Sequence, residues 1–198
     1  MALEVQRRCI ALLSHVADGQ LAPGPTPAWL LRPGRDDCGT QWPLVREIYT
    51  ALTGRDLPEA MPPRERRTID AVLTHPDGTR PLVEIDEKQH FTPPRAVVLD
   101  HYPDDLPTGF DAPEWAARAR AAKRLPGGGF ARPCPPLFPD PGGRHLQRAF
   151  RDGLADLLPS VHGWRPTLRI ADFEVVDWIH AADVADRMAA LVGRRLAT

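Results

Sequence analysis

The sequence predicts a single α/β domain in which helices flank a small mixed sheet, and three observations lead to this fold class. Two strand-like runs, 68–74 and 82–88, flank the turn sequence Pro76-Asp77-Gly78 and predict a β-hairpin. Apolar residues recur at helical spacing on both sides of this hairpin. The chain has 198 residues, which is enough for one domain with excursions but not for two full domains.

The N-terminal part is expected to contribute two helices and a linker. Apolar side chains at helical spacing predict a helix over 3–17, and a glycine follows it as a stop signal. The segment 21–39 is rich in proline and glycine, so we expect irregular structure there. A second helix should begin near Thr40, carry Pro43 in its first turn and end at Gly54.

The register of the hairpin decides which side chains share a face of the sheet. A three-residue Pro-Asp-Gly loop pairs His75 with Thr79, and counting back then places Asp70 opposite Glu84. A two-residue Asp-Gly turn would shift the register by one and place Asp70 opposite Ile85. We adopt the first register because it keeps apolar residues paired with apolar residues. Those pairs, on the other face, are Ile69 with Ile85 and Ala71 with Val83.

The second half of the chain is expected to return to the sheet after a long insertion. In this insertion only 114–125 has a helical pattern. A helix is predicted over 143–158, then a short strand over 167–170 that continues through 173–176, and a terminal helix over 183–196. The resulting division is a core of helix, hairpin, strand, helix and strand over 40–91 and 143–176, with an N-terminal helix and linker at 1–39, a proline-rich irregular insertion at 92–142 and a C-terminal helix at 177–198.

Composition excludes several classes of protein. Three widely spaced cysteines without a CxxC pair argue against a disulfide framework and against a thiolate zinc site. Charges interrupt the N-terminal apolar residues, so we expect no signal peptide, and no run approaches the ~20 apolar residues of a spanning helix. We therefore expect a soluble, cytoplasmic protein without a membrane partner.

The net charge of −1 means that nucleic-acid binding would depend on local basic patches rather than on the overall charge. Each patch taken alone is also compatible with an ordinary solvated surface. The patches are Arg64, Arg66 and Arg67; Arg118, Arg120, Lys123 and Arg124; and Arg144, Arg148 and Arg151.

Acidic residues gather on the hairpin in a pattern typical of a divalent-metal site. In an extended strand, Glu84, Asp86 and Lys88 point to one face, and the adopted register adds Asp70. Three carboxylates on one face repel each other unless a cation lies between them. Mg²⁺ or Mn²⁺ prefers such carboxylate oxygens together with water and phosphate. The competing interpretation is an exposed edge strand with solvated charges.

An Asp, a hairpin and an acid-rich strand with a Lys resemble the PD-(D/E)xK nuclease superfamily, which has the restriction-endonuclease-like fold. The run 84–91 is similar to its very-short-patch-repair-like branch, where an acid, an apolar residue, Asp, Gly, a variable residue, Gln, His and an aromatic residue follow each other. Glu87 stands at the position of the glycine. A helix with Arg and Asp and then the strand 168–170 continue the order. The resemblance covers about 64–91 and 143–170, under a third of the chain.

The resemblance implies a metal-dependent nuclease, with DNA as the expected substrate and the site at one edge of the sheet. It implies metal ligation by Asp70, Glu84 and Asp86. It also implies roles for further residues: Lys88, Gln89 and His90 in catalysis, Arg148 and Arg151 in phosphate contact, and Glu47 as an auxiliary acid on the preceding helix. Arg148 and Asp152, four apart, are expected to pair on the helix surface.

Two other functions stay open at this stage. The chain is alternatively a catalytically inactive nuclease fold that binds nucleic acid or a protein, which the near-neutral charge and Glu87 favour. A further alternative is that the hairpin is a solvated element of an enzyme with unrelated chemistry. This alternative predicts that Asp70 and Glu84 lie on opposite faces of the sheet. The sequence does not predict the oligomeric state, or which nucleic-acid sequence or structure would be recognised.

Overall fold

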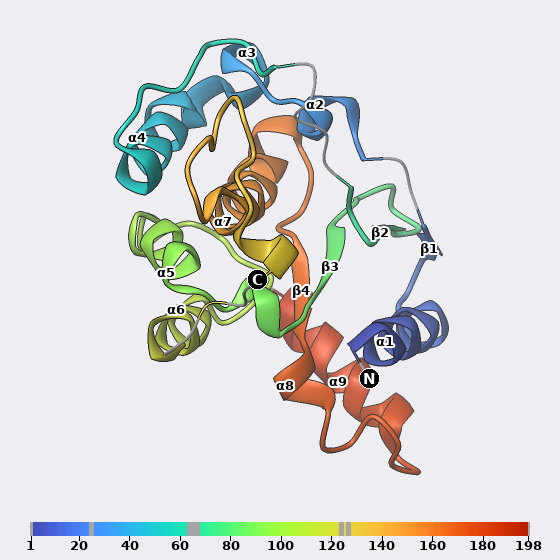
Figure 1. Cartoon of the computed structure of the whole chain (residues 1–198). Helices are drawn as coiled ribbons and strands as arrows, with labels where there is room; N and C mark the ends of the chain where they lie inside the picture. Colours follow the sequence, from blue (N-terminus) through green and yellow to red (C-terminus); the bar gives the residue numbers. More distant parts are fainter. Residues whose placement is uncertain (1, 24–25, 63–67, 123–124, 126–127, 198) are drawn as a thin grey trace.

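The computed structural model describes residues 2–23, 26–62, 68–122, 125 and 128–197. They form an α/β fold around an open, mixed sheet (Figure 1). β4 runs parallel to β3, whereas the other neighbouring strands are antiparallel. The strands, in their order across the sheet, are β1 Gln20–Ala22, β2 Ala71–Thr74, β3 Leu82–Asp86 and β4 Leu168–Ala171. Of the basic residues named above, Arg64, Arg66, Arg67, Lys123 and Arg124 lie outside the described residues.

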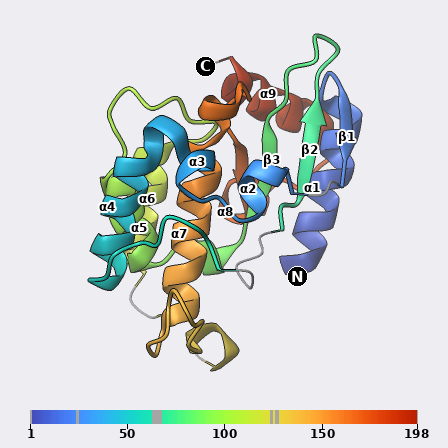
Figure 2. The ribbon, with the colours of Figure 1, turned by 90° about the horizontal axis from the view of Figure 1, so that it is seen from above.

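Helices lie on both sides of the sheet (Figure 2), with α4, α5, α6 and α7 on one side and α1 and α9 on the other. Several begin or end where the sequence predicts: α4 carries a proline in its first turn, and Gly54 ends it in a left-handed conformation with φ 68°. The helices are α1 Ala2–Val16, α2 Ala28–Leu31, α3 Arg35–Cys38, α4 Trp42–Thr53, α5 Pro93–Asp100, α6 Ala112–Ala121, α7 Gly143–Leu157, α8 Asp172–Val175 and α9 Val184–Leu196.

The predicted hairpin register is confirmed. Ala71 pairs with Val83, and the His75 amide donates to the Thr79 carbonyl across the turn at 2.9 Å. Gly78 has φ 84°, a conformation that glycine adopts without strain. Continuing this register places Asp70 across from Glu84, one residue beyond the end of the ladder.

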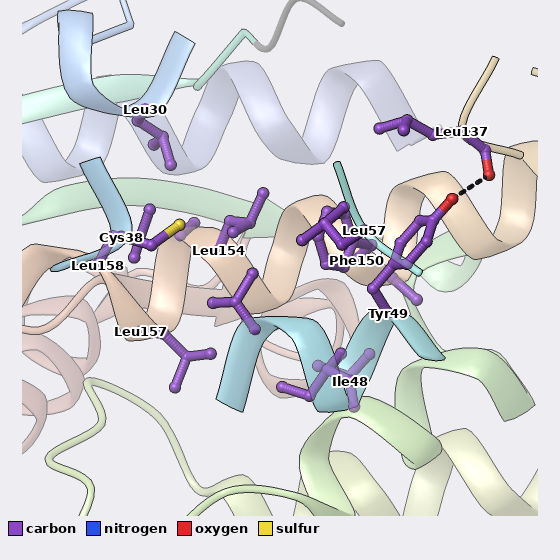
Figure 3. Packing of buried hydrophobic residues seen from close by; sticks show 14 of the residues in the cluster. Leu30, Cys38, Ile48, Tyr49, Leu57, Leu137, Phe150, Leu154, Leu157 and Leu158 are labelled. Atoms are coloured by element: carbon purple, nitrogen blue, oxygen red, sulfur yellow. Dashed lines mark hydrogen bonds between the residues drawn. The ribbon is translucent and has the colours of Figure 1, made fainter. Parts of the chain in front are cut away.

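The two faces of the sheet bury different residues. Val83 and Ile85 pack with α1 and α9 in one apolar cluster. Leu82, on the opposite face, belongs to a larger cluster with α4 and α7 (Figure 3), in which the Tyr49 hydroxyl donates to the Leu137 carbonyl at 2.7 Å. Alternation along β3 therefore directs Glu84 and Asp86 toward the α7 side of the sheet.

Several expectations about the hairpin strands are wrong. Each strand is shorter than predicted, and β3 ends at Asp86 before the chain turns into a 3₁₀ helix at Lys88–His90. Ile69 does not pack beside Ile85, because the chain bends at Asp70 and places Ile69 in the α7-side cluster. The site is not at an edge of the sheet, since β3 lies between β2 and β4.

Other differences concern segments read as irregular. Edge strand β1 begins at Gln20 and extends into the segment 21–39, which also contains α2 and α3. The segment 92–142 contains α5, which packs against α6 and α7 and is part of the folded core. Among the described residues, no strand occurs between 92 and 142. The strand of the sheet that the sequence did not predict is therefore β1. Residues 173–176 do not extend β4, because α8 begins at Asp172.

Candidate active site

A polar pocket of about 310 Å³ lies where the acid-rich strand meets α7. It gathers side chains from α1, the hairpin, the turn after β3 and α7. Six of the nine residues expected to form the site line it, namely Asp70, Glu84, Gln89, His90, Arg148 and Arg151. The other lining residues are Gln6, Thr68, Ile85, Glu87, Arg144 and Asp152.

Asp70 is held from two directions at the point where the chain enters β2. Its Oδ2 accepts a hydrogen bond from the Ile85 amide at 2.7 Å, and its Oδ1 accepts one from Gln6 Nε2 at 2.7 Å. Burial raises the pKa of Asp70, and these two hydrogen bonds offset only part of that increase. The carboxylate is therefore fixed in position and poorly compensated in charge.

Glu84 lies on interior strand β3 and is 6% exposed. It lines the same pocket as Asp70, as the register predicts. This placement contradicts the hypothesis that the two carboxylates lie on opposite faces of the sheet.

Asp86 does not line the pocket of Asp70 and Glu84. It is 1% exposed, and Arg169 Nη1 donates to its two oxygens at 2.7 and 3.0 Å. The indole Nε1 of Trp115 donates to Oδ2 at 2.9 Å. Both oxygens of Asp86 are thus satisfied inside the protein. Across the described ranges, no three or more His, Cys, Asp or Glu side chains are placed so that they could hold a metal ion.

Asp86 belongs instead to a buried ion network centred on Arg169, which is fully buried. Arg169 Nε donates to Asp156 Oδ1 at 2.7 Å, and Asp156 Oδ2 accepts from Arg95 Nη2 and from the Tyr102 hydroxyl, each at 2.6 Å. Burial lowers the pKa of Arg169, but Asp156 and Asp86 outweigh it and hold the pKa above its usual value. Arg169 thus keeps its positive charge although it is shielded from water.

The sequence contains one indication of this network, an arginine within an apolar strand, but the strand pattern alone does not identify its partners. Arg169 stands between Leu168 and Ile170 in a strand buried along its whole length. A charge at such a position needs a buried partner. Asp152 and Asp156 lie four apart on α7, so they project from one side of that helix toward Arg169.

The turn after β3 reverses the expected positions of two neighbouring side chains. Lys88 is exposed and lines a second pocket together with Phe91, Arg118 and Phe173. Glu87 lines the pocket of Asp70 and Glu84 instead. Contrary to the expectation, Lys88 does not point to the same face as Glu84 and Asp86, because β3 ends at Asp86. Beyond the end of a strand, side chains no longer alternate between its two faces.

His90 connects the pocket with the buried network. Its Nδ1 lies 2.9 Å from Asp152 Oδ2 and 3.6 Å from Asp86 Oδ1. Burial lowers the pKa of His90, but the carboxylates of Asp152 and then Asp86 outweigh it, so the pKa is raised. Asp152 itself is 3% exposed, so it does not lie on the helix surface as expected, although Arg148 interacts with it electrostatically. The positive charges of His90 and Arg169 outweigh the burial of Asp152 and lower its pKa.

Basic residues of α7 complete the pocket. Arg144, Arg148 and Arg151 all line it, and Arg148 Nη1 donates to the Gln89 carbonyl at 3.4 Å. Burial, followed by the neighbouring charge of Arg144, lowers the pKa of Arg148. The pocket therefore contains carboxylates and guanidinium groups together.

Glu47, the expected auxiliary acid, is distant from this set. It is exposed on α4, where its Oε1 lies 4.0 Å from His101 Nε2, and it does not line the pocket.

Comparison with known proteins gives no family for this chain: no family model, no curated protein and no solved structure matches it. None of the helices in the described part of the chain combines the length and apolar character required to cross a membrane.

Proposed function

We propose that this chain is a metal-dependent nuclease with a restriction-endonuclease-like core, and that it hydrolyses phosphodiester bonds of nucleic acid, with DNA as the favoured substrate. One observation carries the proposal: the carboxylates Asp70 and Glu84 line a single pocket with Arg144, Arg148 and Arg151. A phosphodiester brings negative charge that needs cations, whereas a divalent ion needs carboxylate oxygens. A pocket that offers both suits hydrolysis of a phosphodiester.

Asp70 and Glu84 fit a bound Mg²⁺ or Mn²⁺. Both supply hard oxygen donors, and Mg²⁺ commonly uses one or two carboxylates together with water and substrate phosphate. The hydrogen bonds to Asp70 come from uncharged donors, the Ile85 amide and Gln6, and burial has raised its pKa. Asp86 does not fit, because Arg169 and Trp115 occupy its oxygens. When bound, the ion would polarise the phosphate and lower the pKa of a water molecule.

The remaining residues of the pocket then have distinct roles. The arginines of α7 bind phosphates of the nucleic-acid backbone, a contact that positions the substrate without reading its sequence. Gln89 and His90 come from the turn after β3 and orient the phosphate or the attacking water. Asp152 holds the His90 ring through Nδ1, so this nitrogen carries a proton and does not act as a base.

The fold supports this proposal by its order of elements. Helix α1 precedes three antiparallel strands, and α7 then leads to β4, which is parallel to β3. The antiparallel pair β2–β3 holds Asp70 and Glu84 together, while β4 supplies the arginine that removes Asp86 from the pocket.

A specific observation also favours a second candidate, a nuclease-like module that binds nucleic acid without cutting it. Arg169 neutralises Asp86, and the described residues include no ready-made three-ligand site. Titration calorimetry with Mn²⁺ separates the two functions. Binding that depends on Asp70 and Glu84 supports the nuclease, and the absence of binding supports the module.

The decisive test is cleavage of plasmid DNA, single-stranded DNA and RNA by the purified full chain with Mg²⁺ or Mn²⁺. We expect metal-dependent cleavage that Asp70→Asn and Glu84→Gln each reduce by at least about 100-fold. Glu59→Gln is the matched control, since Glu59 is 70% exposed in an ion pair with Arg35 outside the pocket. Full cleavage by the folded Asp70→Asn/Glu84→Gln double variant would contradict the proposal.

A further inference from the structure

The backbone after β3 determines which acid of the run Asp86-Glu87 is available to a ligand. Asp86 ends the strand and points into the Arg169 network. Glu87 is extended, with φ −88° and ψ 169°, and the 3₁₀ helix begins after it. This conformation brings Glu87 to the pocket that Asp70 and Glu84 line.

The Glu87 carboxylate is incompletely satisfied. Its Oε2 accepts a hydrogen bond from Gln89 Nε2, but its buried Oε1 has no hydrogen-bond partner among the described residues. A buried carboxylate oxygen without a donor costs free energy, so such an atom at a pocket wall indicates a missing ligand. By contrast, both oxygens of Asp86 are hydrogen-bonded.

The charges around Glu87 favour a cation as that ligand. Asp70 and Glu84 already contribute two carboxylates to the pocket, and a third like charge raises the repulsion among them. Arg148 is close enough to interact electrostatically with Glu87, but neither it nor any other described residue donates a hydrogen bond to the buried Oε1. A divalent cation would relieve the repulsion and also stabilise the unpartnered oxygen.

We propose that Glu87, rather than Asp86, is the third carboxylate that stabilises the divalent cation held by Asp70 and Glu84. This inference rests on the proposed function, because it concerns the same cation. The three side chains do not form a closed set of ligands as they stand. Glu87 therefore acts from outside the direct ligands, through an intervening water, which suits Mg²⁺ because this ion keeps several waters.

Titration calorimetry with Mn²⁺ tests this role without relying on cleavage. Glu87→Gln preserves the shape of the side chain and removes its charge. We expect Glu87→Gln to weaken Mn²⁺ binding by about tenfold or more, the usual effect of losing a residue that supports the direct ligands of a metal. Glu59→Gln, the matched exposed control, should bind Mn²⁺ like the wild type. Unfolding in EDTA verifies that both variants are folded.

The outcomes separate this inference from the proposed function. If Glu84→Gln loses Mn²⁺ binding while Glu87→Gln weakens it by less than about tenfold, Glu87 does not have this role and the nuclease proposal stands. If the wild type neither binds Mn²⁺ nor cleaves, both proposals fail. Asp86→Asn provides a second comparison: in the folded protein, a loss of Mn²⁺ affinity equal to that of Glu87→Gln would also overturn the choice of Glu87 over Asp86.

Discussion

Two groups of carboxylates lie on the α7 side of the sheet, and they differ in what compensates their charge. Asp86 and Asp156 share the fully buried Arg169 and take part in a closed network of hydrogen bonds. Asp70 and Glu84 line an open pocket, and Asp70 receives hydrogen bonds from an amide and a glutamine instead of from a cation.

The difference teaches that the number of acids in a motif does not give the number available for chemistry. Glu84 and Asp86 are two residues apart on one strand and point the same way, yet Glu84 lines the pocket whereas the oxygens of Asp86 accept hydrogen bonds from Arg169 and Trp115. A buried carboxylate whose oxygens are both hydrogen-bonded inside the protein maintains the fold, whereas one that lines a pocket is accessible to a ligand.

The largest effect is expected from breaking the buried network at its centre. Arg169→Met keeps much of the side-chain volume but leaves Asp86 and Asp156 without their shared cation. Removing one partner of a buried ion pair leaves an uncompensated charge, so we expect the free energy of unfolding to fall by about 5 kcal/mol. Urea unfolding followed by circular dichroism measures this change.

The control for that experiment is an ion pair of the same type at the surface. Arg187 donates to Asp183 at 2.8 Å, and both side chains are 52% exposed. Arg187→Met should change the free energy of unfolding by less than about 1 kcal/mol. Equal losses for Arg169→Met and Arg187→Met would show that burial does not distinguish the two groups of carboxylates.

A smaller effect is expected from exchanging single acids on β3. Asp86→Asn should lower the free energy of unfolding by about 3 kcal/mol, because it leaves Arg169 partly uncompensated. Glu84→Gln, two residues away, should lower it by less than Asp86→Asn does, because Glu84 lines the pocket and Asp86 is enclosed by Arg169 and Trp115. Thermal and urea unfolding of the two variants provide the comparison. If Glu84→Gln is the more damaging variant, Glu84 belongs to the structural group.

The sequence was most informative where local geometry decides the structure. The Pro-Asp-Gly turn correctly predicted the register and thus the meeting of Asp70 with Glu84. Helices α1, α4, α7 and α9 also follow their apolar patterns, because each buries one stripe of side chains against the sheet or another helix.

The features of the site that the sequence did not predict depend mainly on contacts between residues far apart in the chain. Arg169 is 83 positions from Asp86, so no local pattern indicated that it would occupy that carboxylate. The alternation of side chains along a strand predicts Lys88 on the face of Glu84, but β3 ends at Asp86 and a 3₁₀ helix follows. Gln6 lies on α1, outside the predicted core, yet it donates to Asp70 from 64 positions away.

The smallest and most localised effect concerns His90, which lies at the boundary between the two groups. Its raised pKa means that the folded state binds the proton more tightly than the unfolded state does. The resulting stabilisation is fully present below the ordinary histidine pKa of about 6.5 and is lost as the pH rises through the folded-state value. The free energy of unfolding should therefore fall over this range in the wild type.

Subtracting the same pH profile for His90→Gln isolates this contribution, because the other titrating groups are common to both proteins. Asp152→Asn gives a sharper comparison. Once the main carboxylate that raises the pKa of His90 is removed, burial should dominate and the pKa should fall. The chemical shift of the His90 ring proton, followed by NMR from pH 5 to pH 9, measures this change. An unchanged midpoint in Asp152→Asn would assign His90 to the open pocket, because its proton would then be independent of the buried network.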